Sequence, residues 1–210
     1  MKPIDMALKT QFVTKSKAAV IFLDKCTSRS KREVLITELS ANLAKFNLTI
    51  DVFGKCGSKE CKRKTMKPCF WRLKKNYFFY LAFEDSLSYD YVTDIVLYAY
   101  KYNAVPIVYG GCRYDQYLPP GSYIDTHNMT VQDLAIKMYD IISHKEKYFD
   151  YFKWKNYYSI MKAPILNACA LCETLNNPAR LNQRVIYKNF RKWWNHFYEV
   201  RCKSDNNELL

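Results

Sequence analysis

Segments of strand length alternate with helical patterns along most of the chain. The expected strands lie at 18–23, 48–53, 78–83, 105–109 and 123–124. Most of these runs are continuously apolar, which is typical of parallel strands buried on both faces of a sheet. Strand–helix alternation at such short spacing predicts an α/β fold with a doubly wound parallel sheet over residues 18–160.

The expected helices each carry one apolar stripe that can pack on this sheet. One pattern runs from Val34 to Phe46, and another includes Ile95 and ends near Tyr102. Thr130 is placed as the cap of a third helix, and an aromatic-rich helix is expected at 145–155.

The sharpest boundary in the pattern follows Phe83, where an apolar run stops at Glu84-Asp85-Ser86. The sequence predicts a strand end, a turn, and then a helix whose first turn carries Tyr91 and Asp94. In α/β sheets, ligands bind where helix N-termini meet the carboxyl ends of the strands. We therefore expect the binding site at this boundary.

A second strand end, at Asp24, leads into a turn at 26–30 and then a helix with Arg32 in its first turn. A cation at that position opposes the helix dipole. Two explanations remain open, a solvated arginine or an arginine held to meet an anion.

Three segments do not fit the sheet pattern. Residues 1–17 are polar and aperiodic and are expected to form a loose leader. Residues 58–75 are basic and are expected to form a loop pinned by disulfides that involve some of Cys56, Cys61 and Cys69. A zinc site is less favoured there, because the cysteine spacings do not give two short hooks.

The third segment is a C-terminal helical extension at 161–210, which contains Cys169 and Cys172. A local disulfide between these two cysteines is favoured over a redox pair or a zinc hook, because neither a thioredoxin-type context nor a second hook is present. The aromatic, basic stretch around Trp193-Trp194 and Cys202 is expected to dock against a partner surface.

Composition adds information on partners and compartment. With 33 lysines and arginines against 20 acidic residues, the formal charge is +13, which suits an anionic partner or simply a basic solvated surface. Eight cysteines and the glycosylation acceptors Asn47 and Asn128 are typical of secretory proteins. Since residues 1–18 lack the apolar core of a signal peptide, we expect the chain to lack its natural beginning.

The stretch Phe83-Glu84-Asp85-Ser86 followed by Asp90-Tyr91-Val92-Thr93-Asp94 resembles the α1,3/4-fucosyltransferases of glycosyltransferase family 10. That family carries Phe-Glu-Asn-Ser and then Asp-Tyr-(Val or Ile)-Thr-Glu-Lys. Similar landmarks continue in order at 51–57, 105–108, 118–124, 151–155 and 169–172, and together they span about residues 18–202.

The resemblance implies a Rossmann-like domain that forms one half of a GT-B glycosyltransferase and binds GDP-fucose. It implies that the N-terminal acceptor domain, which holds the family's general base, is absent from this chain, together with the membrane anchor and stem. The implied reaction is inverting transfer of L-fucose from GDP-β-L-fucose to a GlcNAc hydroxyl of an N-glycan or glycoprotein, in α1,3 linkage, on the lumenal side of the Golgi membrane.

By resemblance, Asp94 is expected to hold the ribose diol, Tyr91 to contact the nucleotide and Arg32 to bind the phosphates. The other donor-site candidates are Glu84, Asp85, Ser86 and Thr93. Glu84 is expected either to hold the turn or to lie near the sugar. No cofactor or bound metal is expected, although a divalent cation is allowed as a stimulant, and no nucleic-acid partner is expected.

Three departures from the family pattern affect donor binding. Asp94 is one methylene shorter than the family's Glu, Asp85 adds a negative charge where the family has Asn, and Ile95 replaces a Lys. Ile95 also fits the packing stripe of its helix. Arg113 or Lys31 is a candidate to supply the lost cation.

Three function hypotheses follow. The first is a fucosyltransferase represented by a truncated chain that by itself transfers little or no fucose. The second is a catalytically inactive pseudo-transferase, and the third is a basic module that binds polyanions with a steep salt dependence.

Overall fold

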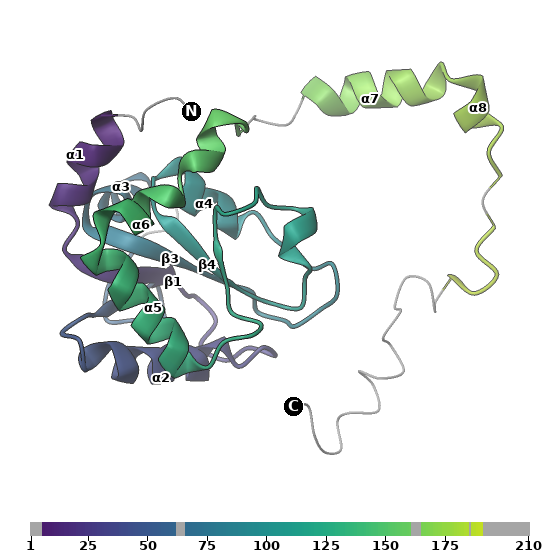
Figure 1. Cartoon of the computed structure of the whole chain (residues 1–210). Helices are drawn as coiled ribbons and strands as arrows, with labels where there is room; N and C mark the ends of the chain where they lie inside the picture. The colour runs from purple at the N-terminus through teal and green to yellow at the C-terminus, as the bar shows by residue number, and fades with distance from the viewer. Residues whose placement is uncertain (1–5, 62–65, 161–164, 185, 191–210) are drawn as a thin grey trace. The chain divides into compact units, whose positions relative to one another are not determined.

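Five parallel strands form one sheet in the order β2-β1-β3-β4-β5 (Figure 1). This is a computed structural model, which describes residues 6–61, 66–160, 165–184 and 186–190. The strands are β1 (Lys17–Phe22), β2 (Ile50–Phe53), β3 (Tyr77–Phe83), β4 (Val105–Tyr109) and β5 (Ile124–Asp125). The parallel α/β fold predicted from the sequence is confirmed.

Strand β3 is central, and all of its residues are buried. Its register pairs Phe79 with Ala19 of β1 on one side and with Val105 of β4 on the other. A strand paired on both sides and covered on both faces can be apolar at every position, which explains the continuous run in the sequence.

Helices cover both faces of this sheet and create two apolar clusters. One cluster contains Leu39 of α2, Met138 of α5 and Tyr148 of α6, and Figure 1 shows α2 beside α5. The other contains Phe70 of α3, Ala99 of α4 and Trp154. The α-helices described up to residue 160 are α1 (Met6–Thr14), α2 (Arg32–Ala44), α3 (Lys67–Asn76), α4 (Ile95–Lys101), α5 (Val131–Ser143) and α6 (Lys145–Asp150).

Helix α1 corrects the expectation of a loose leader, because Met6–Thr14 are helical. Leu8 is buried, and the Phe12 ring lies 5.3 Å from the rings of Phe78 and Tyr148. These contacts are long-range, so a local pattern could not reveal them.

Thr14, the last residue of α1, and Lys15 also donate hydrogen bonds to carbonyls at the C-terminal end of α3. The buried Lys15 Nζ donates to the Lys74 and Tyr77 carbonyls, and Thr14 Oγ1 donates to the Lys75 carbonyl. The last carbonyls of a helix have no partners within it, so these donors complete α3. Burial lowers the pKa of Lys15 to about 7, and the nearby charge of Lys74 contributes in the same direction.

Helix α3 corrects the expectation of a loop at 58–75. Pro68 lies in its first turn, where the missing N–H of proline is tolerated, while Phe70 and Leu73 are buried. A disulfide joins Cys61 to Cys69 of this helix, and a second joins Cys56 to Cys26. The predicted disulfide pinning is therefore confirmed, although part of the segment is helical.

Two other elements match the sequence patterns with small differences. Thr130 caps α5 through a reciprocal capping box with Asp133. The helix expected at 145–155 is instead α6 followed by a separate 3₁₀ turn, Lys153–Asn156, that buries Trp154.

The chain divides into two compact units on either side of Ile160. In the second unit the structure describes α7 (Ile165–Leu175) and α8 (Pro178–Leu181). Cys169 and Cys172 lie in α7 as free, exposed thiols, so the predicted disulfide between them is not formed in this structure. Trp193, Trp194 and Cys202 fall outside the described residues. No described helix is both long enough and apolar enough to span a membrane.

Asp51 in β2 is the focus of a charged network at the sheet. Its Oδ2 accepts hydrogen bonds from Lys17, Lys59 and Tyr77, and its side chain is only 11% exposed. Although burial acts to raise the pKa of Asp51, these hydrogen bonds and the Lys59 charge lower the pKa to about 2.

The Asp51→Asn variant is expected to lose about 2 kcal/mol of unfolding free energy at neutral pH. Because the folded-state pKa of Asp51 is depressed, the contribution is complete above pH ~4 and declines as the pH falls toward 2. Urea unfolding across this range should therefore show the gap between wild type and variant closing at acidic pH. Glu60→Gln, at an exposed carboxylate, serves as the control, and a gap independent of pH would contradict the assignment.

Candidate functional site: the switch point between strands β1 and β3

The candidate site lies where the sheet changes its winding direction. The chain passes from β1 through α2 to β2 on one side of β1, whereas β3 pairs on the other side. The loops after β1 and β3 therefore leave the sheet side by side at its carboxyl edge. In open α/β sheets, ligands bind in the crevice at this point.

Hydrogen bonds join the two loops directly. Ser30 N donates to the Asp85 carbonyl at 3.1 Å, and Ser30 Oγ donates to the Glu84 carbonyl at 2.6 Å. Tyr109, at the end of β4, donates its hydroxyl to the Ser30 carbonyl at 2.9 Å. These bonds place the β1–α2 loop against the β3–α4 loop.

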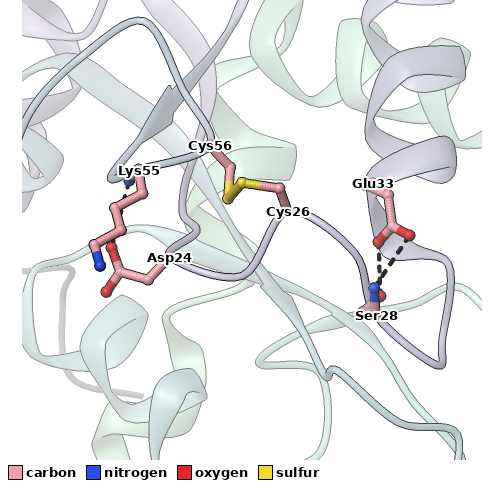
Figure 2. Close-up of a disulfide and its surroundings, with 6 residues drawn as sticks. All are labelled: Asp24, Cys26, Ser28, Glu33, Lys55 and Cys56. Carbon is pink, nitrogen blue, oxygen red and sulfur yellow. Dashed lines mark hydrogen bonds between the residues drawn. A yellow bond between two sulfur atoms is a disulfide. The ribbon is translucent and has the colours of Figure 1, made fainter.

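A disulfide holds the β1–α2 loop near the end of β1, as Figure 2 shows. Cys26 is bonded to Cys56, and Cys56 N donates to the Leu23 carbonyl at 3.2 Å. Gly54 permits this close approach, since a Cβ there would lie 2.4 Å from the Leu23 carbonyl oxygen.

The start of α2 is held by Ser28 and Glu33. Ser28 Oγ donates to Glu33 Oε2 at 2.7 Å, and Ser28 N donates to Glu33 Oε1 at 3.2 Å (Figure 2). Partial burial acts to raise the pKa of Glu33, but the bonds from Ser28 and the nearby Arg32 charge hold it below its usual value. The negative charge of Glu33 in the first turn of α2 interacts favourably with the positive end of the helix dipole.

Arg32 is the first residue of α2 and is half-buried. Its Nη1 donates to the Phe83 carbonyl at 2.6 Å, while its Nε is buried and has no hydrogen-bond partner. A guanidinium has five N–H donors, and a buried donor without a partner costs free energy. The structure thus holds Arg32 at the end of β3, which argues against the solvated-arginine explanation.

Asp85 is surrounded by donors and cations. Its Oδ1 accepts from the Tyr91 hydroxyl and its Oδ2 from Lys25 Nζ, each at 3.2 Å. Partial burial acts to raise the pKa of Asp85, but the bonds from Lys25 and Tyr91 and the charges of Lys25 and Arg32 hold it below its usual range. Asp85 is therefore a paired anion at the mouth of the site.

Glu84 is buried and anchors the other end of the same loop. Its carboxylate accepts from Thr93 N at 2.8 Å and from Thr93 Oγ1 at 3.0 Å. Burial raises the pKa of Glu84, and the Asp85 charge adds to this, while the Thr93 bonds and the Arg32 charge oppose it. Of the two roles open to Glu84 in the sequence, these contacts favour holding the turn.

The start of α4 differs from the sequence prediction. The helix is Ile95–Lys101, so Tyr91 precedes it and Asp94 is its N-cap residue, exposed and without a side-chain cap bond. The Glu84–Thr93 bonds hold the loop just before the helix. Ile95 is partly buried against the α3–α4 cluster, as its place in the packing stripe predicted.

Asp94 and Arg32 both act on Tyr80 of β3. Burial raises the pKa of Tyr80, Tyr98 and Asp94 raise it further, and the Arg32 charge lowers it. Both charges therefore lie within electrostatic reach of one phenol in the middle of β3. Within the described part of the chain, no group of three or more His, Cys, Asp or Glu side chains could hold a metal ion.

A family model described as "Glycosyltransferase family 10 (fucosyltransferase) C-term" matches residues 12–204. The chain belongs to this fucosyltransferase family.

Curated relatives agree with this assignment. Alpha-(1,3)-fucosyltransferase C of Drosophila melanogaster is 36% identical over 90% of this chain, which covers 43% of that protein. Glycoprotein 3-alpha-L-fucosyltransferase A of the same organism is 31% identical over 87% of this chain, which covers 36% of that protein. The chain thus spans less than half the length of these two relatives.

A solved crystal structure of α1,3-fucosyltransferase with GDP-fucose matches with a TM-score of 0.58 at 17% identity. The match covers 87% of this chain and 51% of the solved one. At this identity the similarity shows the fold.

For this fucosyltransferase-family domain, the structure brings together most of the residues selected from the sequence. Arg32, Glu84, Asp85, Tyr91 and Thr93 are connected by hydrogen bonds or by electrostatic effects on pKa. Asp94 and Ser86 lie on the same loop, Asp94 exposed and Ser86 half-buried, without a side-chain bond to the others. Sequence reasoning missed Ser30 and Lys25, although Lys25 follows the first strand and precedes Cys26 directly.

Both glycosylation acceptors are accessible. Asn47 lies in the turn after α2 with a φ of 56°, and Asn128 precedes α5; both side chains are exposed. Their modification remains a prediction.

Proposed function

We propose that this chain binds GDP-fucose at the β1/β3 switch point and supplies the donor half of a fucosyl transfer. The observation that carries the proposal is the junction of the β1–α2 and β3–α4 loops, which places Arg32 beside Asp85 and Tyr91 at the carboxyl edge of the sheet. Family membership and the likeness to a structure with GDP-fucose support the choice of donor.

Each donor-site residue has a role that suits its chemistry. The exposed Asp94 carboxylate can accept two hydrogen bonds from a ribose diol, and Tyr91 offers an aromatic face to the nucleotide. Arg32 can bind phosphate oxygens, including through its unpartnered Nε, and so stabilise the negative charge of departing GDP.

The proposed reaction is a direct displacement at the anomeric carbon of fucose, with inversion of configuration. The bond to the phosphate oxygen breaks while a GlcNAc O3 hydroxyl attacks, and its proton passes to a general base. We place that base, the acceptor contacts and a Golgi membrane anchor in sequence beyond this domain. No covalent nucleophile is required.

Calorimetric titration of the chain with GDP, and with UDP as the control nucleotide, tests donor binding. We expect GDP to bind and UDP to bind at least tenfold more weakly, since the proposed donor carries guanosine and not uridine. Equal affinities for the two, or no heat with GDP, would contradict the donor site.

Fucose transfer distinguishes the enzyme from an inactive relative. The chain alone is expected to show little transfer to a GlcNAc-terminated acceptor, whereas a longer polypeptide that contains an acceptor domain should transfer fucose. GDP binding without transfer in the longer protein would instead indicate a pseudo-transferase. Binding to heparin with a steep salt dependence and no GDP binding would favour the polyanion module.

A further inference from the structure

We propose that Lys25 is a phosphate-binding residue of the donor site and that Asp85 positions it when no donor is bound. The inference rests on the proposed function, because it assigns a residue within the same GDP-fucose site. In this proposal, Lys25 is the second cation of the site, beside Arg32.

A neighbouring disulfide and an ion pair hold Lys25 near the site. It lies just after β1, beyond Leu23 and Asp24, and directly precedes Cys26, whose disulfide to Cys56 holds this loop. Its Nζ lies 3.2 Å from Asp85 Oδ2 on the neighbouring loop. Asp85 is also under the influence of Arg32, so Lys25 and Arg32 lie around one carboxylate at the switch point.

The ammonium of Lys25 is free to accept a stronger ligand. Its side chain is 74% exposed, and one of its three N–H donors is used by Asp85. Exposed ion pairs of this kind contribute little to stability, so the Lys25–Asp85 bond is easily exchanged. A pyrophosphate carries more negative charge than a single carboxylate and would attract the ammonium more strongly.

The described first turn of α4 carries no cation. The first turn of α4 begins Ile95-Val96-Leu97, and Ile95 packs into the α3–α4 cluster instead of facing a ligand. In this proposal, the β1–α2 loop and the start of α2, where Lys25 and Arg32 lie, supply positive charge for the phosphates.

The two cations that the sequence offered as replacements are less well placed. Arg113 is exposed and pairs with Asp115 at 3.4 Å. Lys31 is exposed at the N-cap of α2, and no ion pair connects it to a described residue of the site. Arg113 also hydrogen-bonds Tyr89 of the β3–α4 loop. Among these three cations in the described structure, Lys25 is the one paired with Asp85.

Asp85 thus has a positioning role. It holds Lys25 on Oδ2 and the Tyr91 hydroxyl on Oδ1, so one carboxylate orients both the proposed phosphate ligand and the proposed nucleotide contact. Its negative charge, which the sequence marked as unfavourable beside a dianionic ligand, is balanced by Lys25.

The test is titration of the intact chain and its Lys25→Gln variant with GDP and with guanosine. We expect the variant to bind GDP about tenfold more weakly, to bind guanosine with unchanged affinity, and to show a weaker dependence of GDP affinity on salt. Lys25→Arg should retain most of the affinity for GDP because it keeps the charge.

Arg29→Gln and Lys55→Gln are matched controls: Arg29 is exposed on the same loop, and Lys55 lies on the opposite side of the disulfide. Both should bind GDP like the unaltered chain, and all variants should unfold at the same temperature. A GDP affinity within twofold of wild type for Lys25→Gln would overturn the role of Lys25 while leaving the donor site intact. Failure of the unaltered chain to bind GDP would overturn both.

Discussion

Replacing Arg32 with alanine is expected to weaken GDP binding by about 100-fold, because the variant loses charge-assisted bonds to phosphate worth about 2–3 kcal/mol. Arg32 is half-buried and already oriented by its bond to the Phe83 carbonyl, so little side-chain entropy is lost when a ligand binds. Isothermal titration with GDP measures the change.

Two further variants make this result specific. Arg29→Ala removes an exposed arginine three residues earlier in the same loop and should leave the affinity for GDP unchanged. Arg32→Lys should give an intermediate loss, since an ammonium keeps the charge but not the planar fork of donors. If guanosine binding fell as much as GDP binding, Arg32 would act through the fold and not through phosphate.

Removing the Cys26–Cys56 disulfide by a double substitution to alanine should lower the free energy of unfolding by about 3.5 kcal/mol. The figure comes from the chain-entropy model for a loop of about 30 residues, the sequence separation of the two cysteines. GDP affinity should also fall, because the β1–α2 loop that carries Lys25 would no longer be held to Gly54–Cys56. Urea unfolding and GDP titration measure the two effects.

The second disulfide provides the matched control. Cys61 and Cys69 are separated by 8 residues, so their removal should cost about 2.5 kcal/mol by the same model. It should leave GDP affinity unchanged, since neither cysteine belongs to the loops after β1 and β3. Equal losses of GDP affinity in both double variants would show that general destabilisation explains the effect.

The positions of the strands were predictable because burial on both faces leaves a local signal. The all-apolar β3 and the capping box of α5 are recorded in consecutive residues, and both were found at their expected places. Helix α1 was missed because its stability comes from Phe12 and Leu8 packing on distant residues. Helix α3 was missed because its apolar face is short and lies within a basic, cysteine-containing segment.

In the candidate site too, some features have a local sequence signal and others depend on contacts between distant residues. Polar residues that follow a strand or begin the next helix, such as Glu84-Asp85 and Arg32, could be selected from the sequence. That Asp85 pairs with Lys25 could not, since 60 residues separate them and the contact exists only because β1 and β3 are neighbours in the sheet. Likewise, only the structure shows that Glu84 binds Thr93 and that α4 begins at Ile95, after Tyr91.

By itself, the amino-acid sequence determined the fold class, the family and the stretch of chain around which the candidate site is built. These properties are encoded in local periodicity and in ordered motifs, which need no knowledge of distant contacts. The tertiary structure decided which cysteines pair within the sheet domain, which charges meet across the switch point, and that Arg32 is held rather than solvated. Such pairings depend on strand order and loop packing, and those are set by the whole chain.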